Sequence, residues 1–160
     1  MQDIDASSIL HGWDNYPIGQ FPTLWNWISG QITSGDLSMS RVAYEEISNV
    51  SPDCAEWLRD CQITRKDITN AIVIAALAIK DELGIQNDNF HTDGVGENDI
   101  FIIATAKVSG VRLISDESKQ KTLPSNLRRY KMPTVCDMQS VAVPCINFVE
   151  YIKQSNRVFG

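Results

Sequence analysis

Carboxylate side chains beside apolar segments are the groups of this chain best suited to do chemistry. They are Asp5, Glu46, Asp99 and the adjacent pair Asp116 and Glu117. Several carboxylates that converge at one end of a sheet repel one another unless a divalent cation holds them. If the fold brings these positions together, the set predicts a metal-dependent nuclease.

Asp5 and Glu46 each have a site interpretation and a local one. Asp5 ends a strand expected over residues 3–5, and open parallel sheets bind ligands beyond the carboxyl ends of their strands. The local alternative is a cap for the helix that follows. Glu46 falls on the apolar face of a helix expected over residues 41–49, where a carboxylate is costly unless it is paired or bound to a metal. The local alternative is a boundary residue that reaches solvent.

The three later acids allow the same two interpretations. Asp99 stands where a helix opens, at Asn98 or Asp99, and free N–H groups there also favour a simple capping carboxylate. Asp116 and Glu117 end a strand expected over residues 111–115, at the sheet edge predicted for Asp5. Acids in such places are also common in turns. Only the joint arrangement favours a site.

The charge distribution adds a possible nucleic-acid contact. The net charge of −6 is not typical of a nucleic-acid-binding protein. Six of the fourteen Lys and Arg residues nevertheless fall within one short stretch: Arg112, Lys119, Lys121, Arg128, Arg129 and Lys131. This stretch predicts a phosphate-contacting rim beside the acids. An ordinary solvated loop is the alternative.

The elements expected around these residues alternate between helices and short strands. Helices are expected from Pro22 onward, over 41–49, 53–60 and 67–83, and from residue 98 or 99 to Gly110. Strands are expected over 3–5, 37–39, 111–115 and 145–148, with a short tail after the last. This order predicts a single domain over residues 1–160, with a three-layer α/β/α fold and a mostly parallel sheet. The helix over 67–83 is apolar on nearly every face, so the fold or a partner chain must cover it.

Composition and absent motifs argue against several classes of protein. No apolar stretch of about 18 residues occurs and no signal-peptide pattern opens the chain, so no membrane association is expected and the default compartment is the cytoplasm. No phosphate-binding GxxxxGK(S/T) loop is present, and two histidines give little support to a histidine-based site. Asp3-Ile-Asp5 mimics the opening of haloacid-dehalogenase-type phosphatases, but only two residues precede it. The four cysteines match no common zinc spacing and are expected to be reduced thiols.

The order of the acidic motifs resembles a PIN domain, the fold of VapC-type toxin ribonucleases. Ile4-Asp5-Ala-Ser-Ser-Ile-Leu resembles its opening, and Met39-Ser-Arg-Val-Ala-Tyr-Glu-Glu46-Ile its second acidic motif. Asn98-Asp99-Ile-Phe-Ile-Ile-Ala-Thr-Ala resembles the third, and Leu113-Ile-Ser115-Asp-Glu117 the fourth, which is usually Thr-x-Asp. The Tyr16-Pro17 to Trp27 segment and Met132-Pro133-Thr-Val-Cys136 resemble one PIN-like family described as uncharacterised.

The resemblance implies a role for each of these positions. Asp5, Glu46 and Asp99 would be metal ligands, direct or through water, and Glu117 would stand at the fourth acidic position. Asp116 would be a neighbouring candidate and Ser115 would replace the usual Thr. The longer Glu117 departs from the commoner Asp, which leaves open whether the site is active.

The resemblance also implies a mechanism and partners. Mg²⁺ or Mn²⁺ would activate a water that cuts RNA and leaves a 3′ hydroxyl, with Arg128, Arg129 and Lys131 holding the backbone. The protein would be the toxin of a toxin–antitoxin pair, with a cognate antitoxin and a possible homodimer. The first alternative is a non-catalytic PIN-like module that binds RNA or protein. The second is a DNA-directed nuclease of the flap-endonuclease class, although no helical arch is evident.

Overall fold

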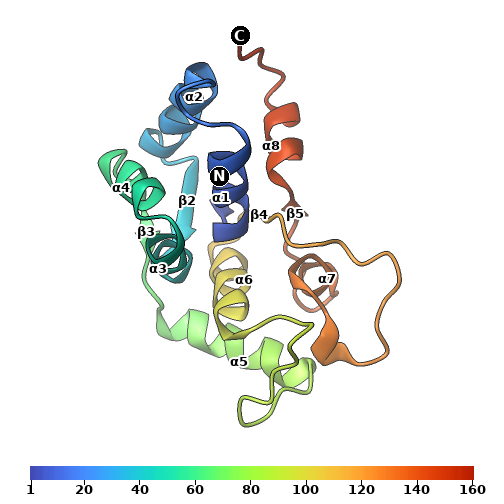
Figure 1. Cartoon of the computed structure of the whole chain (residues 1–160). Coiled ribbons are helices and arrows are strands. Elements are labelled where there is room, and N and C mark those ends of the chain that lie inside the picture. Colours follow the sequence, from blue (N-terminus) through green and yellow to red (C-terminus); the bar gives the residue numbers. More distant parts are fainter.

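A five-stranded, all-parallel sheet forms the centre of the computed structural model, which describes residues 1–160 (Figure 1). The strand order is β3-β2-β1-β4-β5, and every neighbouring pair is parallel. The strands are β1 (Gln2–Ile4), β2 (Leu37–Ser40), β3 (Arg65–Lys66), β4 (Arg112–Ile114) and β5 (Cys145–Ile146). All five therefore end at the same edge of the sheet, and β1 ends at the middle of that edge.

Helices cover the sheet and make the crossovers that parallel strands require. They are α1 (Ala6–Asn15), α2 (Pro22–Thr33), α3 (Arg41–Val50), α4 (Pro52–Asp60), α5 (Asn70–Glu82), α6 (Glu97–Ser109), the 3₁₀ turn η1 (Leu127–Arg129), α7 (Met132–Asp137) and α8 (Phe148–Gln154). In Figure 1, α2, α3 and α4 lie to one side of α1 and α6, while α7 and α8 lie to the other. The prediction of a three-layer α/β/α fold is confirmed.

Local sequence signals explain several element boundaries. Ser40 caps α3, because its hydroxyl accepts a hydrogen bond from the Val42 N–H at 3.2 Å. Pro22 opens α2, where its missing N–H costs nothing. Gly110 ends α6 with a positive φ of 67°, a conformation that favours glycine. These three boundaries agree with the sequence-based expectations.

Other boundaries differ from expectation for physical reasons. The helix expected from residue 67 begins at Asn70, because Thr69 caps it and the preceding β3 pairs with β2. The helix expected from residue 98 or 99 begins at Glu97, so Asp99 lies in its first turn rather than at the cap. The tail expected after the last strand is the helix α8, whose cap Asn147 exchanges hydrogen bonds with Glu150.

The apolar helix α5 is covered on one side only. Ile72, Ala76 and Ile79 are buried against the fold. Ile74 and Leu77, by contrast, are 68% and 58% exposed. The fold therefore leaves an apolar strip of this helix facing solvent. No helix of the chain has both the length and the apolar character needed to cross a membrane.

Candidate active site

Asp5 lies immediately after the central strand β1 and is almost completely buried, with 2% of its surface exposed. Its Oδ2 accepts hydrogen bonds from the hydroxyls of Ser7, at 2.5 Å, and Ser115, at 3.2 Å. Its side chain does not cap α1. The pKa of Asp5 is raised from 3.8 to about 7: burial is the largest cause, the charges of Asp99 and Glu46 act in the same direction, and the two serine hydrogen bonds oppose them. A carboxylate in this position is costly to ionise.

Three further carboxylates converge on Asp5 from separate elements. Glu46 comes from the middle of α3, Asp99 from the first turn of α6, and Glu117 from the segment after β4. Burial raises the pKa of each of these groups. The Asp99 charge raises the pKa of Glu46 and of Glu117 further, and the Glu117 charge acts on Glu46 in the same way. Asp5, Glu46, Asp99 and Glu117 thus form one electrostatically coupled group, called here the carboxylate cluster.

Asp99 has a structural role as well as its place in the cluster. Its Oδ2 accepts a hydrogen bond from the Gly96 N–H at 2.9 Å and so completes the first turn of α6. This hydrogen bond opposes the effect of burial on the pKa of Asp99. The capping alternative and the site interpretation therefore both describe Asp99, because one carboxylate oxygen caps the helix and the charge acts on the cluster.

Asp116 points away from the carboxylate cluster. Its Oδ1 accepts hydrogen bonds from the Ser8 hydroxyl, at 2.5 Å, and from the Phe148 N–H, at 2.9 Å. Its Oδ2 lies 3.8 Å from Nδ1 of His11. These contacts tie the end of β4 to α1 and to the start of α8. Of the adjacent acids that follow β4, Glu117 is the member that the fold turns toward the cluster.

The basic stretch provides one cation at the cluster and uses two others to hold loops. Lys131 lines a surface hollow of about 240 Å³ together with Asp99 and Glu117, and its charge lowers the pKa of Glu117. Arg128 donates to the Asn89 carbonyl at 3.0 Å, and Arg129 lies 3.6 Å from Asp93. Both arginines thus fasten the loop before α6. Of these three, Lys131 is the residue placed at the carboxylates.

Sequence reasoning missed two supporting residues, Ser7 and Gly94. The Ser7 hydroxyl donates to Asp5 and accepts from the Asp116 N–H at 2.9 Å, so it joins the ends of β1 and β4. The sequence signal for Ser7 was the pair Ser7-Ser8 in an otherwise apolar segment, because a buried hydroxyl needs a hydrogen-bond partner. Gly94 packs so closely on η1 that an added Cβ would lie 1.8 Å from the Arg128 carbonyl oxygen. No local pattern indicates that contact.

The donor atoms of the cluster suit a hard divalent cation, although the carboxylates lie too far apart to hold one as positioned. All its ligating atoms are carboxylate oxygens, which Mg²⁺ and Mn²⁺ prefer. The raised pKa of the buried Asp5 indicates negative charge that lacks compensation. No group of three or more His, Cys, Asp or Glu side chains is close enough to hold an ion as positioned. Small side-chain movements would therefore accompany binding.

Comparison with known proteins places the whole chain in one family. No curated protein matches the chain. The family described as "Domain of unknown function (DUF4411)" matches residues 3–159, a span that contains every strand except the first residue of β1, and all four members of the carboxylate cluster. The chain therefore belongs to the DUF4411 family.

Proposed function

We propose that this protein is a metal-dependent nuclease that hydrolyses phosphodiester bonds of RNA. The convergence of Asp5, Glu46, Asp99 and Glu117 at the carboxyl edge of a parallel sheet carries the proposal. Ligands of open α/β sheets bind at this edge. Asp5 is buried, and the raised pKa of each of the four carboxylates reports a cost of ionising it that the fold does not need, apart from the cap that Asp99 gives to α6.

The residues of the cluster divide into a fixed member and adjustable ones. Asp5 is held by Ser7 and Ser115, and would anchor the cation from the floor of the site. Glu46 and Glu117 are longer and more accessible, and would move toward it. Bound by these oxygens, Mg²⁺ or Mn²⁺ would lower the pKa of an attacking water and stabilise charge on the phosphate. The carboxylates would also orient that water.

Lys131 would hold the substrate backbone in this proposal. It lines the same hollow as Asp99 and Glu117, so a phosphate beside the carboxylates would lie within reach of its ammonium group. A backbone contact of this kind carries no sequence information. The site is an open surface hollow rather than a deep channel, and it fits an exposed single strand of RNA better than a closed duplex. An RNA substrate and action in the cytoplasm belong to the same proposal.

The partners implied by the PIN-like resemblance belong to the same proposal. A toxin would need an antitoxin that binds over the carboxylate cluster and blocks it. A homodimer would cover exposed apolar area, and the strip of α5 with Ile74 and Leu77 offers such area. Size-exclusion chromatography with light scattering would test the dimer, since a monomer at micromolar concentration would contradict it.

The open geometry favours one alternative, a non-catalytic module that binds RNA or protein. In the chain as folded, no three acidic side chains are close enough to hold a metal ion. Glu117, which stands where the PIN-like pattern usually has a shorter acid, is exposed. A decayed site would keep the fold and the RNA-facing edge, but its melting temperature would not respond to Mn²⁺.

Cleavage of a labelled panel of RNAs, with flap DNA for comparison, would test the proposal. Wild type should cut single-stranded RNA with Mg²⁺ or Mn²⁺ and not with EDTA. Asp5→Asn and Asp99→Asn should each lose at least about a hundredfold in rate, the usual order for removing a group that stabilises charge. Asp81→Asn, on the exposed side of α5, is the matched control and should cut like wild type. Equal cutting by wild type and Asp5→Asn would indicate a contaminant, and preferred cutting of flap DNA would favour the DNA-directed class.

A further inference from the structure

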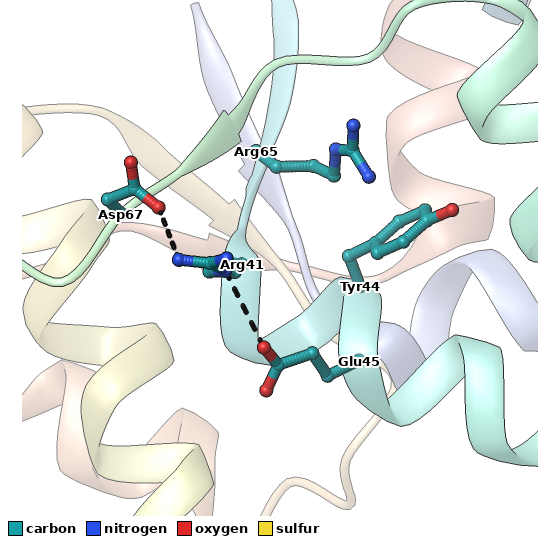
Figure 2. Close-up of a pocket in the computed structure, with 5 residues that line it drawn as sticks. All are labelled: Arg41, Tyr44, Glu45, Arg65 and Asp67. Atoms are coloured by element: carbon teal, nitrogen blue, oxygen red, sulfur yellow. Dashed lines mark hydrogen bonds and ion pairs between the residues drawn. The ribbon is translucent and has the colours of Figure 1, made fainter.

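A second surface hollow, of about 400 Å³, lies beside α3 and the edge strand β3 (Figure 2). Its lining residues are Arg41, Tyr44 and Glu45 of α3, Arg65 of β3, and Asp67 just after that strand. We call it the α3–β3 hollow. Arg41 directly follows β2 and Asp67 directly follows β3, so the hollow lies at the carboxyl edge of the sheet, the same edge at which Asp5 follows the neighbouring strand β1.

One wall of the α3–β3 hollow is a stacked pair that a base can extend. The Arg65 guanidinium lies over the Tyr44 ring, with 4.6 Å between Cζ and the ring centroid. The Tyr44 hydroxyl donates to the Ala55 carbonyl at 3.2 Å, which fixes the ring. Arg65 itself takes no part in the ion pairs of the hollow (Figure 2). Guanidinium planes and aromatic rings are the surfaces on which proteins stack unpaired RNA bases.

The opposite wall combines hydrogen-bond donors with acceptors. Arg41 donates to Asp67 Oδ1 at 2.9 Å, and its Nε lies 3.6 Å from Glu45 Oε1. Each carboxylate keeps its second oxygen free of these contacts. The two arginines and two acids make the hollow nearly neutral. A phosphate needs donors alone and would be repelled by the acids, whereas a base edge needs donors and acceptors side by side.

Guanine matches this set better than the other bases. Its O6 and N7 accept from an arginine, in the commonest base-specific contact that proteins make. Its N1–H and amino group are adjacent donors, which a carboxylate with a free oxygen accepts. Adenine presents its amino group beside ring acceptors, so the same carboxylate would face a lone pair.

We propose that the α3–β3 hollow binds a guanine base of single-stranded RNA, stacked on Arg65 with its edges between Arg41 and the acids. The proposal rests on the proposed nuclease function, to which it adds a base preference beside the cut. The carboxylate cluster would then perform the cleavage, and this hollow would select where it occurs.

The test is a titration of metal-free, ¹⁵N-labelled protein with 5′-GMP and 5′-AMP, followed by NMR. GMP should move the side-chain Nε–H signals of Arg65 and Arg41 and the amide of Tyr44. It should bind about tenfold more tightly than AMP, the discrimination expected of one good bidentate contact. Arg65→Lys keeps the charge but loses the stacking plane, and should weaken GMP about tenfold. Arg157→Lys makes the same change at an exposed site elsewhere and should bind as wild type does.

Each outcome bears on one proposal at a time. Equal binding of GMP and AMP, equal effects of the two Arg→Lys variants, or no movement of these signals at millimolar nucleotide would overturn the guanine site. If no signal moves, a protein segment with paired charges becomes the next candidate ligand to test at the α3–β3 hollow. Because the titration contains no metal and measures no cleavage, an inactive nuclease would leave a positive result intact. Metal-dependent cleavage without GMP binding would refute only the base site.

Discussion

Replacing Asp5 by Asn should stabilise the metal-free protein at neutral pH, although it removes a candidate ligand. Burial raises the pKa of Asp5 from 3.8 to about 7. The folded protein therefore holds this proton more tightly than the unfolded chain does. Wild-type stability should fall as pH rises from about 4 to about 7, with the loss complete above that range. At about 1.4 kcal/mol per pH unit, the ionised side chain costs about 4 kcal/mol.

Asn avoids this cost because it is neutral at every pH. Its amide oxygen can still accept the hydrogen bonds from Ser7 and Ser115. In EDTA at pH 8, the variant should melt roughly 10 °C above wild type, since about 1 kcal/mol corresponds to roughly 2–4 °C in a domain of this size. At pH 4 the two proteins should melt at nearly the same temperature. Thermal melts followed by circular dichroism between pH 4 and pH 8 measure the difference in melting temperature at each pH.

The matched control is Asp116→Asn, the same change at an acid outside the carboxylate cluster. Its Oδ1 accepts hydrogen bonds from Ser8 and Phe148 that a neutral amide oxygen would hold less strongly, so this variant should lose about 1 kcal/mol. Mn²⁺ should raise the melting temperature of wild type and leave that of Asp5→Asn nearly unchanged. The buried-charge reasoning is refuted if Asp5→Asn gains nothing at pH 8, or gains as much at pH 4.

Two further predictions concern a loop contact at Gly94 and the buried acid in the middle of β1. Gly94→Ala should destabilise the protein, because its Cβ would meet the Arg128 carbonyl, whereas Gly30→Ala has open space and should stabilise by about 0.5–1 kcal/mol. Urea unfolding measures the free energy of unfolding of both variants. Equal effects would contradict the close contact between Gly94 and the Arg128 carbonyl. Lys66→Met should lose about 3 kcal/mol or more, because buried Asp3 has its only ion pair with Lys66 at 2.6 Å. Adding Asp3→Asn should recover much of that loss, and a double variant no better than the single one would refute this account.

The fold class followed from the sequence because its signals are local. Caps such as Ser40 and stops such as Gly110 act within one turn, and such signals predicted α2 to α6 and four of the five strands in their correct order. The elements that were missed depend on distant partners. β3 is two residues long and exists because it pairs with β2, and α7 follows a loop held by the Asn89 and Asp93 contacts of Arg128 and Arg129.

The order of strands and helices explains why the predicted acids lie near one another, while their use as a site stays a prediction. Asp5, Glu46, Asp99 and Glu117 do converge, because the ends of parallel strands meet at one edge. The choice between Asp116 and Glu117 was left open, since two adjacent acids after a strand look equivalent in sequence. The structure separates them, because the Ser8 hydroxyl and the Phe148 N–H both donate to Asp116.

The hydrogen bond from Ser115 to Asp5 spans 110 positions of the chain. During synthesis, β1 leaves the ribosome first. The side of β1 that pairs with β4 has no partner strand until β4 has also emerged. The anchoring carboxylate therefore gains its full environment only when more than two thirds of the chain has emerged. A nuclease built in this order would lack a complete metal-binding edge for most of the time that its chain is being made.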